Sequence, residues 1–305
     1  MSEEREDFMT RKNKGVFLGM LGTCSYGTNP LFALPLYAAG MDVNSVLFYR
    51  YLGAVILYGL WVSCYKKVSL KISLKEAGVM AALGVVFSMS SLTLFMSYSL
   101  IGAGIASTIL FVYPIMVAVL MAVFFHEKID LRTVASIVLM SAGILLFYKT
   151  DDGKTLSLYG VVLTLLSALS YAVYMIALKQ LKTAKRMHFP TLTFYVMFFG
   201  LFVFLFNLRF GLDLKPIETP FIAACVIGLA VFPTIVSLET MTIAIKLIGP
   251  TLSAILGALE PVTAVLIGVF VFGEAMTLRI AAGILLILVS VLLIVLKKKE
   301  KVKNS

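Results

Sequence analysis

The sequence predicts an all-α integral membrane protein with ten transmembrane helices, arranged as two inverted five-helix repeats. Three observations predict this fold class: the composition, the succession of apolar runs and a pattern that occurs twice. Hydrophobic residues make up 60% of the 305 positions and charged residues 14%, with a mean hydropathy of +1.00. A soluble domain has about 45–50% apolar and about 25% charged residues, so this chain is suited to lipid. Apolar runs of the ~20 residues that a spanning helix needs recur throughout, so helices and no sheet are expected.

A pattern in the first half of the chain returns in the second half. A shift of 147 positions, without a gap, relates Gly102 to Gly249, Pro114 to Pro261, Glu127 to Glu274, and Leu131-Arg132 to Leu278-Arg279. Near the start of each half, a shift of 145 relates Gly15 to Gly160 and Tyr26 to Tyr171. A repeat of this length indicates that a whole membrane half was duplicated, as in transporters with internal repeats.

Ten spans follow one another along the chain, separated by short breaks that contain charged, Gly or Pro residues. They are 15–39, 43–65, 76–98, 102–125, 131–148, 158–178, 190–210, 220–245, 250–272 and 277–296. The expected domains are a cytoplasmic tail (1–14), a first five-helix repeat (15–148), an extracytoplasmic linker (149–157), a second five-helix repeat (158–296) and a basic cytoplasmic tail (297–305).

The distribution of Lys and Arg predicts the orientation. Of the 26 basic residues, 20 lie on the same side of the spans as the N-terminus, 5 lie on the other side, and Arg50 lies within a span. Cytoplasmic loops are enriched in Lys and Arg, so both termini are expected in the cytoplasm and the protein in the plasma (inner) membrane. Because each repeat has an odd number of spans, the second must be inverted relative to the first.

Several function classes are not indicated. The net charge of +10 is spread between apolar runs, so no nucleic-acid partner is expected. The three cysteines have no CxxC spacing, so neither a disulfide nor a metal site is predicted. No HExxH, GxSxG or Walker pattern occurs, so we expect no enzyme, no catalytic residue and no cofactor. The expected partners are the lipid bilayer and a small-molecule substrate.

The duplicated order of proline, apolar run, glutamate and Leu-Arg, with Gly273-Glu274 and the segment 259–262 (Leu-Glu-Pro-Val), resembles the EamA-like permeases of the drug/metabolite transporter superfamily. The resemblance extends from about Gly15 to Leu296. It implies two five-helix inverted repeats around a central cavity, and export of small metabolites such as amino acids or their derivatives. Inverted repeats also place a substrate site near the midplane on general grounds, and rocking one half against the other gives alternating access.

Charged residues within the spans are the strongest site candidates. Arg50, Glu239 and Glu260 are the only ones well inside the predicted spans, where a charge costs at least roughly 2.5–3.5 kcal/mol and usually marks a pathway. Arg50 could receive a substrate carboxylate, pair with a glutamate, or extend to the outer interface. Glu239 could line the pathway or be an interface residue near Lys246.

Glu260 is the leading candidate for the main polar determinant of the site and for proton coupling. It follows Gly249 by eleven residues, roughly 16 Å at ~1.5 Å per residue, which is about half of the ~30 Å hydrocarbon thickness. Pro261 frees a carbonyl one turn back, which favours a polar pocket. A carboxylate there could bind a proton in one access state and release it in another. The structural alternative is a protonated glutamate that only hydrogen-bonds across helices.

Matched prolines and tyrosines complete the candidate set. Pro114 and Pro261 could open the backbone to a cavity or could only kink their helices. Tyr26, Tyr171, Tyr174 and Tyr113 lie inside apolar runs and could line a substrate path with hydroxyls and ring faces, or could only pack. Because Tyr113 stands where the second repeat has a glutamate, the two halves are expected to differ in function.

A stripe of small residues in the second repeat predicts a close helix contact. Gly249, Ser253 and Gly257 recur every four residues, and such stripes allow close packing within the chain or in a homodimer. The function predicted overall is a secondary transporter. The sequence leaves open a non-transporting receptor or scaffold and, among transporters, a nucleotide-sugar or drug permease.

Overall fold

The computed structural model describes residues 2–101, 106, 109–146, 157–273 and 276–295. Within these ranges every regular element is a helix, which confirms the predicted all-α class. Residues 149–156 of the predicted linker and the predicted basic tail (297–305) lie outside the described residues, as do Gly102 and Glu274.

Helices follow one another along both halves of the chain. The first half contains α1 (Ser2–Tyr26), α2 (Asn29–Ala38), α3 (Val43–Leu60), the π-helical η1 (Trp61–Lys66), α4 (Leu74–Ile101), α6 (Tyr113–Phe125) and α7 (Leu131–Leu145). The second half contains α8 (Leu158–Gln180), α9 (Lys182–Arg186), α10 (Phe189–Asn207), η2 (Arg209–Gly211), α11 (Pro220–Ala230), the π-helical η3 (Val231–Val236), α12 (Ser237–Ile248), α13 (Pro250–Leu256), α14 (Leu259–Phe272) and α15 (Leu278–Val295).

Six helical segments in the described part of the chain are long and apolar enough to cross a membrane. They are Val43–Lys66, Leu74–Ser97, Leu158–Gln180, Phe189–Asn207, Pro220–Ile248 and Pro250–Val271. Shorter apolar helices are Tyr113–Phe125, Leu131–Leu145 and Leu278–Leu293. The protein is therefore a multi-pass membrane protein, and the count of ten spans stays a prediction.

The predicted cytoplasmic tail (1–14) is part of helix α1, which begins at Ser2, and its place outside the membrane stays a prediction. Lys, Arg and Glu are good helix formers and extend the helix beyond its apolar part. Pro114 and Pro261 do not kink continuous helices, because the chain breaks just before them and they lie in the first turns of α6 and α14. Proline is tolerated there because the first turn has no backbone acceptors for its missing N–H.

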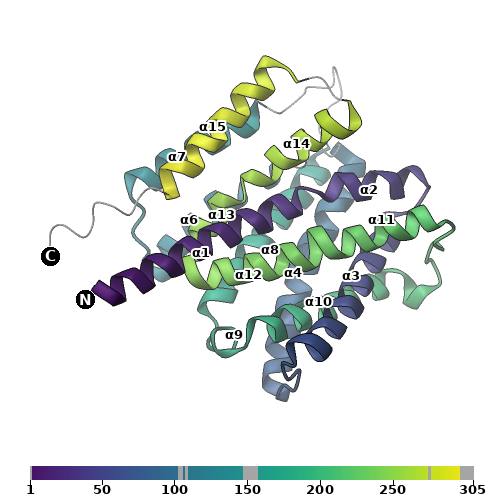
Figure 1. Cartoon of the computed structure of the whole chain (residues 1–305). Coiled ribbons are helices and arrows are strands. Elements are labelled where there is room, and N and C mark those ends of the chain that lie inside the picture. The colour runs from purple at the N-terminus through teal and green to yellow at the C-terminus, as the bar shows by residue number, and fades with distance from the viewer. Residues whose placement is uncertain (1, 102–105, 107–108, 147–156, 274–275, 296–305) are drawn as a thin grey trace.

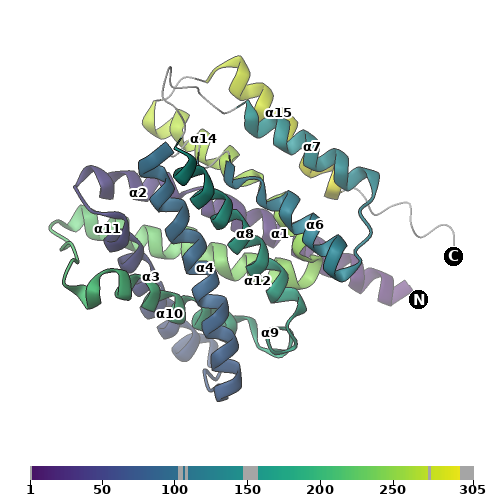
Figure 2. The same ribbon diagram turned by 180° about the vertical axis from the view of Figure 1, so that it is seen from behind.

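Helices of the two halves pack in matched pairs. α1 lies beside α12 (Figure 1), and α4 lies beside α8 (Figure 2). The same close contact occurs in both pairs: a Cβ added at Gly15 would lie 2.6 Å from Cγ2 of Ile248, and one added at Gly160 would lie 2.6 Å from Cγ2 of Ile101. Gly15 is the counterpart of Gly160, and Ile101 is the counterpart of Ile248. In each pair, therefore, a glycine of one half packs against an isoleucine of the other half, at equivalent positions of the repeat.

The last helices of the two halves form a third pair at one edge of the molecule (Figure 1). The Oγ of Ser290 in α15 donates to the carbonyl oxygen of Ser136 in α7 at 2.7 Å. A Cβ added at Gly143 would lie 2.7 Å from the carbonyl oxygen of Gly283. The shift of 147 relates Ser136 to Gly283 and Gly143 to Ser290, so these two contacts are counterparts of each other. Such exchange is the geometry of a two-fold axis between the halves.

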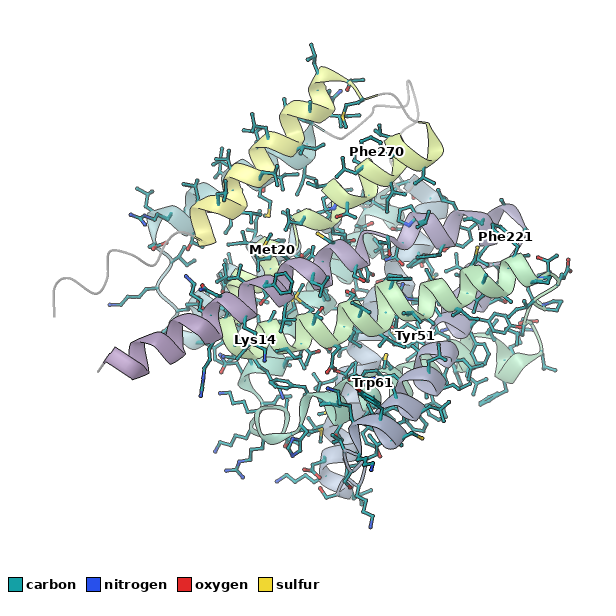
Figure 3. The ribbon with its side chains drawn as sticks, in the orientation of Figure 1. Lys14, Met20, Tyr51, Trp61, Phe221 and Phe270 are labelled. Atoms are coloured by element: carbon teal, nitrogen blue, oxygen red, sulfur yellow. The ribbon has the colours of Figure 1, made fainter. Side chains whose placement is uncertain are left out.

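The two ends of the bundle carry different side chains. Lys14 lies toward the end at which α1 begins, whereas Phe221 and Phe270 lie toward the other end (Figure 3). Phe221 is 65% exposed and Phe270 is 80% exposed. α15 runs back toward the end at which α1 begins (Figure 1). Exposed apolar side chains of this size are suited to lipid contact.

Candidate functional site

A small cavity lies between the two halves. α1, α3 and α4 line it from the first half, and α8, η3 and α12 line it from the second. The lining residues are Tyr26, Arg50, Phe87, Tyr171, Tyr174, Pro233, Thr234, Ser237, Leu238, Met241 and Thr242. Of these described residues, Arg50 alone is charged. Four of the residues singled out from the sequence therefore meet here: Tyr26, Arg50, Tyr171 and Tyr174.

The break between α1 and α2 lies next to this cavity. Gly27 and Thr28 form a turn directly after Tyr26, and the Oγ1 of Thr28 donates to the carbonyl oxygen of Ser25 at 2.6 Å. A Cβ added at Gly27 would lie 2.6 Å from the carbonyl oxygen of Glu260, so only glycine allows this approach. The break in α1/α2 is thus packed against the start of α14.

A second irregular segment, η3, is built around Pro233. Because Pro233 has no N–H, it cannot donate to the carbonyl of Leu229 one turn back. The Oγ1 of Thr234 donates to that carbonyl at 2.8 Å instead. The Oγ of Ser25 donates to the carbonyl oxygen of Phe232 at 2.6 Å. π-helical segments inside α-helices occur frequently at functional sites, and here side chains supply the donors that a regular helix would supply.

Arg50 joins the two irregular segments. Its Nε donates to Oγ1 of Thr234 at 2.6 Å and its Nη2 donates to the carbonyl oxygen of Pro233 at 2.9 Å. Its Nη1 donates to Oδ1 of Asn29, at the start of α2, at 3.2 Å. The guanidinium carbon also lies 5.4 Å from the ring centroid of Tyr26. Arg50 is only 2% exposed, so in this conformation it does not extend to a membrane interface.

Glu260 lies in the same part of the structure as Arg50. Its carbonyl oxygen approaches Gly27, the residue after Tyr26, and the Arg50 guanidinium lies over the Tyr26 ring; among the described residues Arg50 forms no ion pair. Glu260 is the second residue of α14, partly buried, and its backbone N–H donates to the carbonyl of Gly257 at 3.0 Å. The start of a helix carries partial positive charge, which favours a carboxylate there. The carboxylate lies beside the cavity and is not part of its lining.

Tyr113, the counterpart of Glu260, belongs to the same cluster. Its ring is edge-on to that of Tyr171, with 5.0 Å between centroids, and its hydroxyl donates to the carbonyl oxygen of Ala254 at 3.2 Å. A Cβ added at Gly257 would collide with this hydroxyl. The small-residue stripe therefore accommodates another helix of the same chain at Gly257, and the predicted homodimer stays a prediction.

Glu239 is placed apart from the other candidates. It accepts a short hydrogen bond from the hydroxyl of Tyr58, which links α12 to α3. It is partly buried and interacts electrostatically with Lys246. The Nζ of Lys246 donates to the carbonyl oxygen of Met187 at 3.0 Å. This cluster does not line the cavity, so a pathway role for Glu239 stays a prediction.

Sequence analysis missed several residues of the site. Asn29, Phe87 and Thr242 carry no motif and lie in ordinary apolar surroundings. Thr234 could have been found, since it directly follows a proline within a predicted span and has a hydroxyl able to satisfy the freed carbonyl.

The fold is that of a multi-pass membrane protein built from two matched halves with a cavity between them. The model of the EamA-like transporter family matches residues 13–149 and 158–296. The chain therefore belongs to the EamA-like transporter family, which confirms the resemblance found in the sequence.

Two comparisons with individual proteins agree with this assignment. An uncharacterized transporter from Archaeoglobus fulgidus is 30% identical over 190 residues, covering 62% of this chain and 65% of that relative. The match thus spans less than two thirds of the relative's length. A solved crystal structure superimposes with a TM-score of 0.76 at 16% identity, covering 92% of this chain and 96% of the other, which shows a shared fold.

Proposed function

We propose that this protein is a secondary transporter that exports small metabolites, such as amino acids or their derivatives, by alternating access. Membership of a transporter family supports transport over catalysis or a receptor role. The observation that carries the proposal is the cavity between two matched halves, where Arg50 and two irregular helical segments meet. Broken helices at the interface of inverted repeats are typical of substrate sites in secondary transporters.

Alternating access would use the pairing of the halves. If α1/α12 and α4/α8 are counterparts, opening one pair while the other stays closed exposes the cavity to one side of the membrane at a time. Ten spans, a plasma (inner) membrane location and cytoplasmic termini are part of this proposal. Cysteines introduced at Lys128 and Ser157 check the orientation: in intact cells an impermeant reagent should label the second and not the first.

Proton coupling through Glu260 is the finer part of the proposal. Glu260 lies at a helix start and near the Arg50 guanidinium without an ion pair among the described residues, so its charge is not permanently neutralised. A change in the distance to Arg50, or in hydration, between the two access states would change the proton affinity of the carboxylate. That difference is what couples proton flow to export.

The test is flux into proteoliposomes for a panel of amino acids, with and without an imposed proton gradient. Glu260→Gln keeps shape and hydrogen bonding but removes ionisation, so we expect a folded protein without proton-driven flux. Glu218→Gln, at an exposed position between η2 and α11, is the matched control and should transport normally. Wild-type flux with wild-type pH dependence in Glu260→Gln would disprove the coupling role. Absence of any flux in the wild type, extended to drugs and nucleotide sugars, would favour a receptor or scaffold.

A further inference from the structure

Two hydroxyl groups in the cavity have no hydrogen-bond partner among the described residues. Neither the Oη of Tyr174 on α8 nor the Oγ1 of Thr242 on α12 makes a hydrogen bond there, although Tyr174 is 1% exposed and Thr242 is 0% exposed. The two groups lie near each other without meeting hydrogen-bond geometry. Both residues line the cavity. Buried polar side-chain atoms in proteins are nearly always hydrogen-bonded, so unpaired hydroxyls aimed at a cavity indicate a bound polar group.

The side chains that pack on the Tyr174 ring are uncharged. The ring of Phe87 lies 4.8 Å from that of Tyr174, and Tyr171 stacks at 6.4 Å on the same ring. Arg50, the charged residue in the described lining, directs its donors to Asn29, Thr234 and Pro233 instead. An ammonium placed beside Tyr174 and Thr242 would therefore lack a counter-charge, because the charged residue in the described lining, Arg50, is itself positive.

The hydrogen-bonding properties of the Tyr174 and Thr242 hydroxyls indicate which chemical group of a ligand would fit beside them. A tyrosine hydroxyl and a threonine hydroxyl can each donate one hydrogen bond and accept others. The best complement is a group that also donates and accepts, which is a hydroxyl. A methyl group in the same place would leave both protein hydroxyls buried without partners.

We propose that Tyr174 and Thr242 form a subsite that selects substrates carrying an uncharged hydroxyl group. The subsite rests on the proposed transport function and specifies its substrate class. Selectivity arises because a site built to hydrogen-bond a hydroxyl discriminates strongly against the analogue that lacks it.

The experiment uses the full chain in proteoliposomes with an isosteric pair of probes, L-threonine and L-valine, which differ by a hydroxyl in place of a methyl. We expect the wild type to transport threonine at least tenfold faster than valine at equal concentration. Tyr174→Phe and Thr242→Val should each reduce this preference to about threefold or less, because each removes one hydroxyl and little volume.

Two matched variants separate the subsite from general effects of losing a hydroxyl. Thr240→Val acts on the same helix, where the Oγ1 of Thr240 donates to its own helix at the carbonyl of Val236 at 2.7 Å. Tyr51→Phe removes another buried tyrosine hydroxyl, which does not line the cavity. Both controls should keep the wild-type preference. Equal transport of the two probes by the wild type, or an unchanged preference in Tyr174→Phe and Thr242→Val, would overturn the proposal.

Melting temperatures distinguish failure of the subsite from failure of the transport proposal. Removing an unpaired buried hydroxyl should leave the melting temperature unchanged or raise it, whereas removing a structural one lowers it. If the wild type moves neither probe, amino-acid export is wrong, and the melting temperatures decide the rest. A fall of several degrees in Tyr174→Phe and Thr242→Val, relative to the controls, would then show a structural role and overturn the subsite; unchanged or raised values would support it.

Discussion

The α1/α12 and α4/α8 interfaces are counterparts that share their packing and differ in their continuity. Gly15 against Ile248 and Gly160 against Ile101 make the same close approach. Yet α4 and α8 are continuous helices, whereas their counterparts are irregular. The helix is interrupted between α1 and α2, and the π-helical segment η3 directly precedes α12. Duplicated halves have thus kept the contacts where helices cross and diverged where the cavity lies.

Polar contacts show the same divergence. In the unbroken interface, Ser90 and Ser167 each donate to the other's carbonyl oxygen, at 2.9 and 2.7 Å. In the irregular interface, Ser25 and Arg50 donate to carbonyl oxygens of η3 at 2.6 and 2.9 Å. The serine pair joins two regular helices, whereas the side chains of Ser25 and Arg50 supply hydrogen-bond donors that the backbone of the irregular segment lacks. We expect the irregular interface to rearrange more than the regular one as the two pairs open in turn during transport.

Removing Arg50 should have the largest effect on this comparison. Arg50→Met keeps length but removes the donors to Asn29, Thr234 and Pro233 in the irregular interface only. Hydrogen bonds from a charged group contribute about 1.5–3 kcal/mol each, so we expect the free energy of unfolding to fall by about 3 kcal/mol and flux to be lost. Thermal unfolding in detergent measures the change. Arg209→Met, at an exposed ion pair with Asp213, should change little. A stable, active Arg50→Met protein would show that the irregular segments hold without it.

Matched glycine substitutions test how alike the two interfaces are. Gly15→Ala and Gly160→Ala should each lower the free energy of unfolding by about 1–2 kcal/mol, because the new methyl group overlaps an isoleucine at the same distance. The two losses should agree within about 0.5 kcal/mol if the packing is equivalent. If only Gly160→Ala lowered the free energy of unfolding, the α1/α12 interface would be able to shift and accept the added methyl group, whereas the α4/α8 interface would not.

Serine substitutions should produce the smallest effect. Ser90→Ala removes a hydroxyl that donates to Ser167 and lies 3.1 Å from its Oγ. Interhelical hydrogen bonds in membranes average about 0.6 kcal/mol, so a loss of about 1 kcal/mol is expected, with transport retained. Ser290→Ala, which removes a single bond to Ser136 in the α7/α15 pair, is the control and should cost about half as much. A larger loss of transport than of stability in Ser90→Ala would place motion in the regular interface.

Fold class and duplication could be predicted because both depend on composition and spacing alone. Apolar runs fix which segments are helical in lipid, and the shifts of 145 and 147 pair Gly15 with Gly160 and Ile101 with Ile248 before any contact is known. Pro114 and Pro261 were expected within continuous helices. They lie instead in the first turns of α6 and α14, where a proline is tolerated because no backbone acceptor awaits its missing N–H.

The details of the site could not be predicted because they depend on distant parts of the chain. Arg50 and Thr234 are 184 positions apart, and only the folded chain brings the guanidinium to the carbonyl of Pro233. From the sequence, a substrate, a glutamate or the membrane interface could each have been the partner of Arg50. In the folded chain its donors contact two helix irregularities, which no sequence pattern indicated, and a substrate role for Arg50 stays a prediction.

The correspondence of Tyr113 and Glu260 bears on why one chain contains both halves. The two positions lie close to each other, since the hydroxyl of Tyr113 packs on Gly257, whose carbonyl oxygen accepts from the backbone N–H of Glu260. In an assembly of two identical half-length chains, a glutamate at this position would occur twice, and two neighbouring carboxylates resist being charged together. Joining the halves in one polypeptide lets selection change one copy alone. A single acidic group can then face a phenol across the axis, an asymmetry that no symmetric ancestor could have encoded.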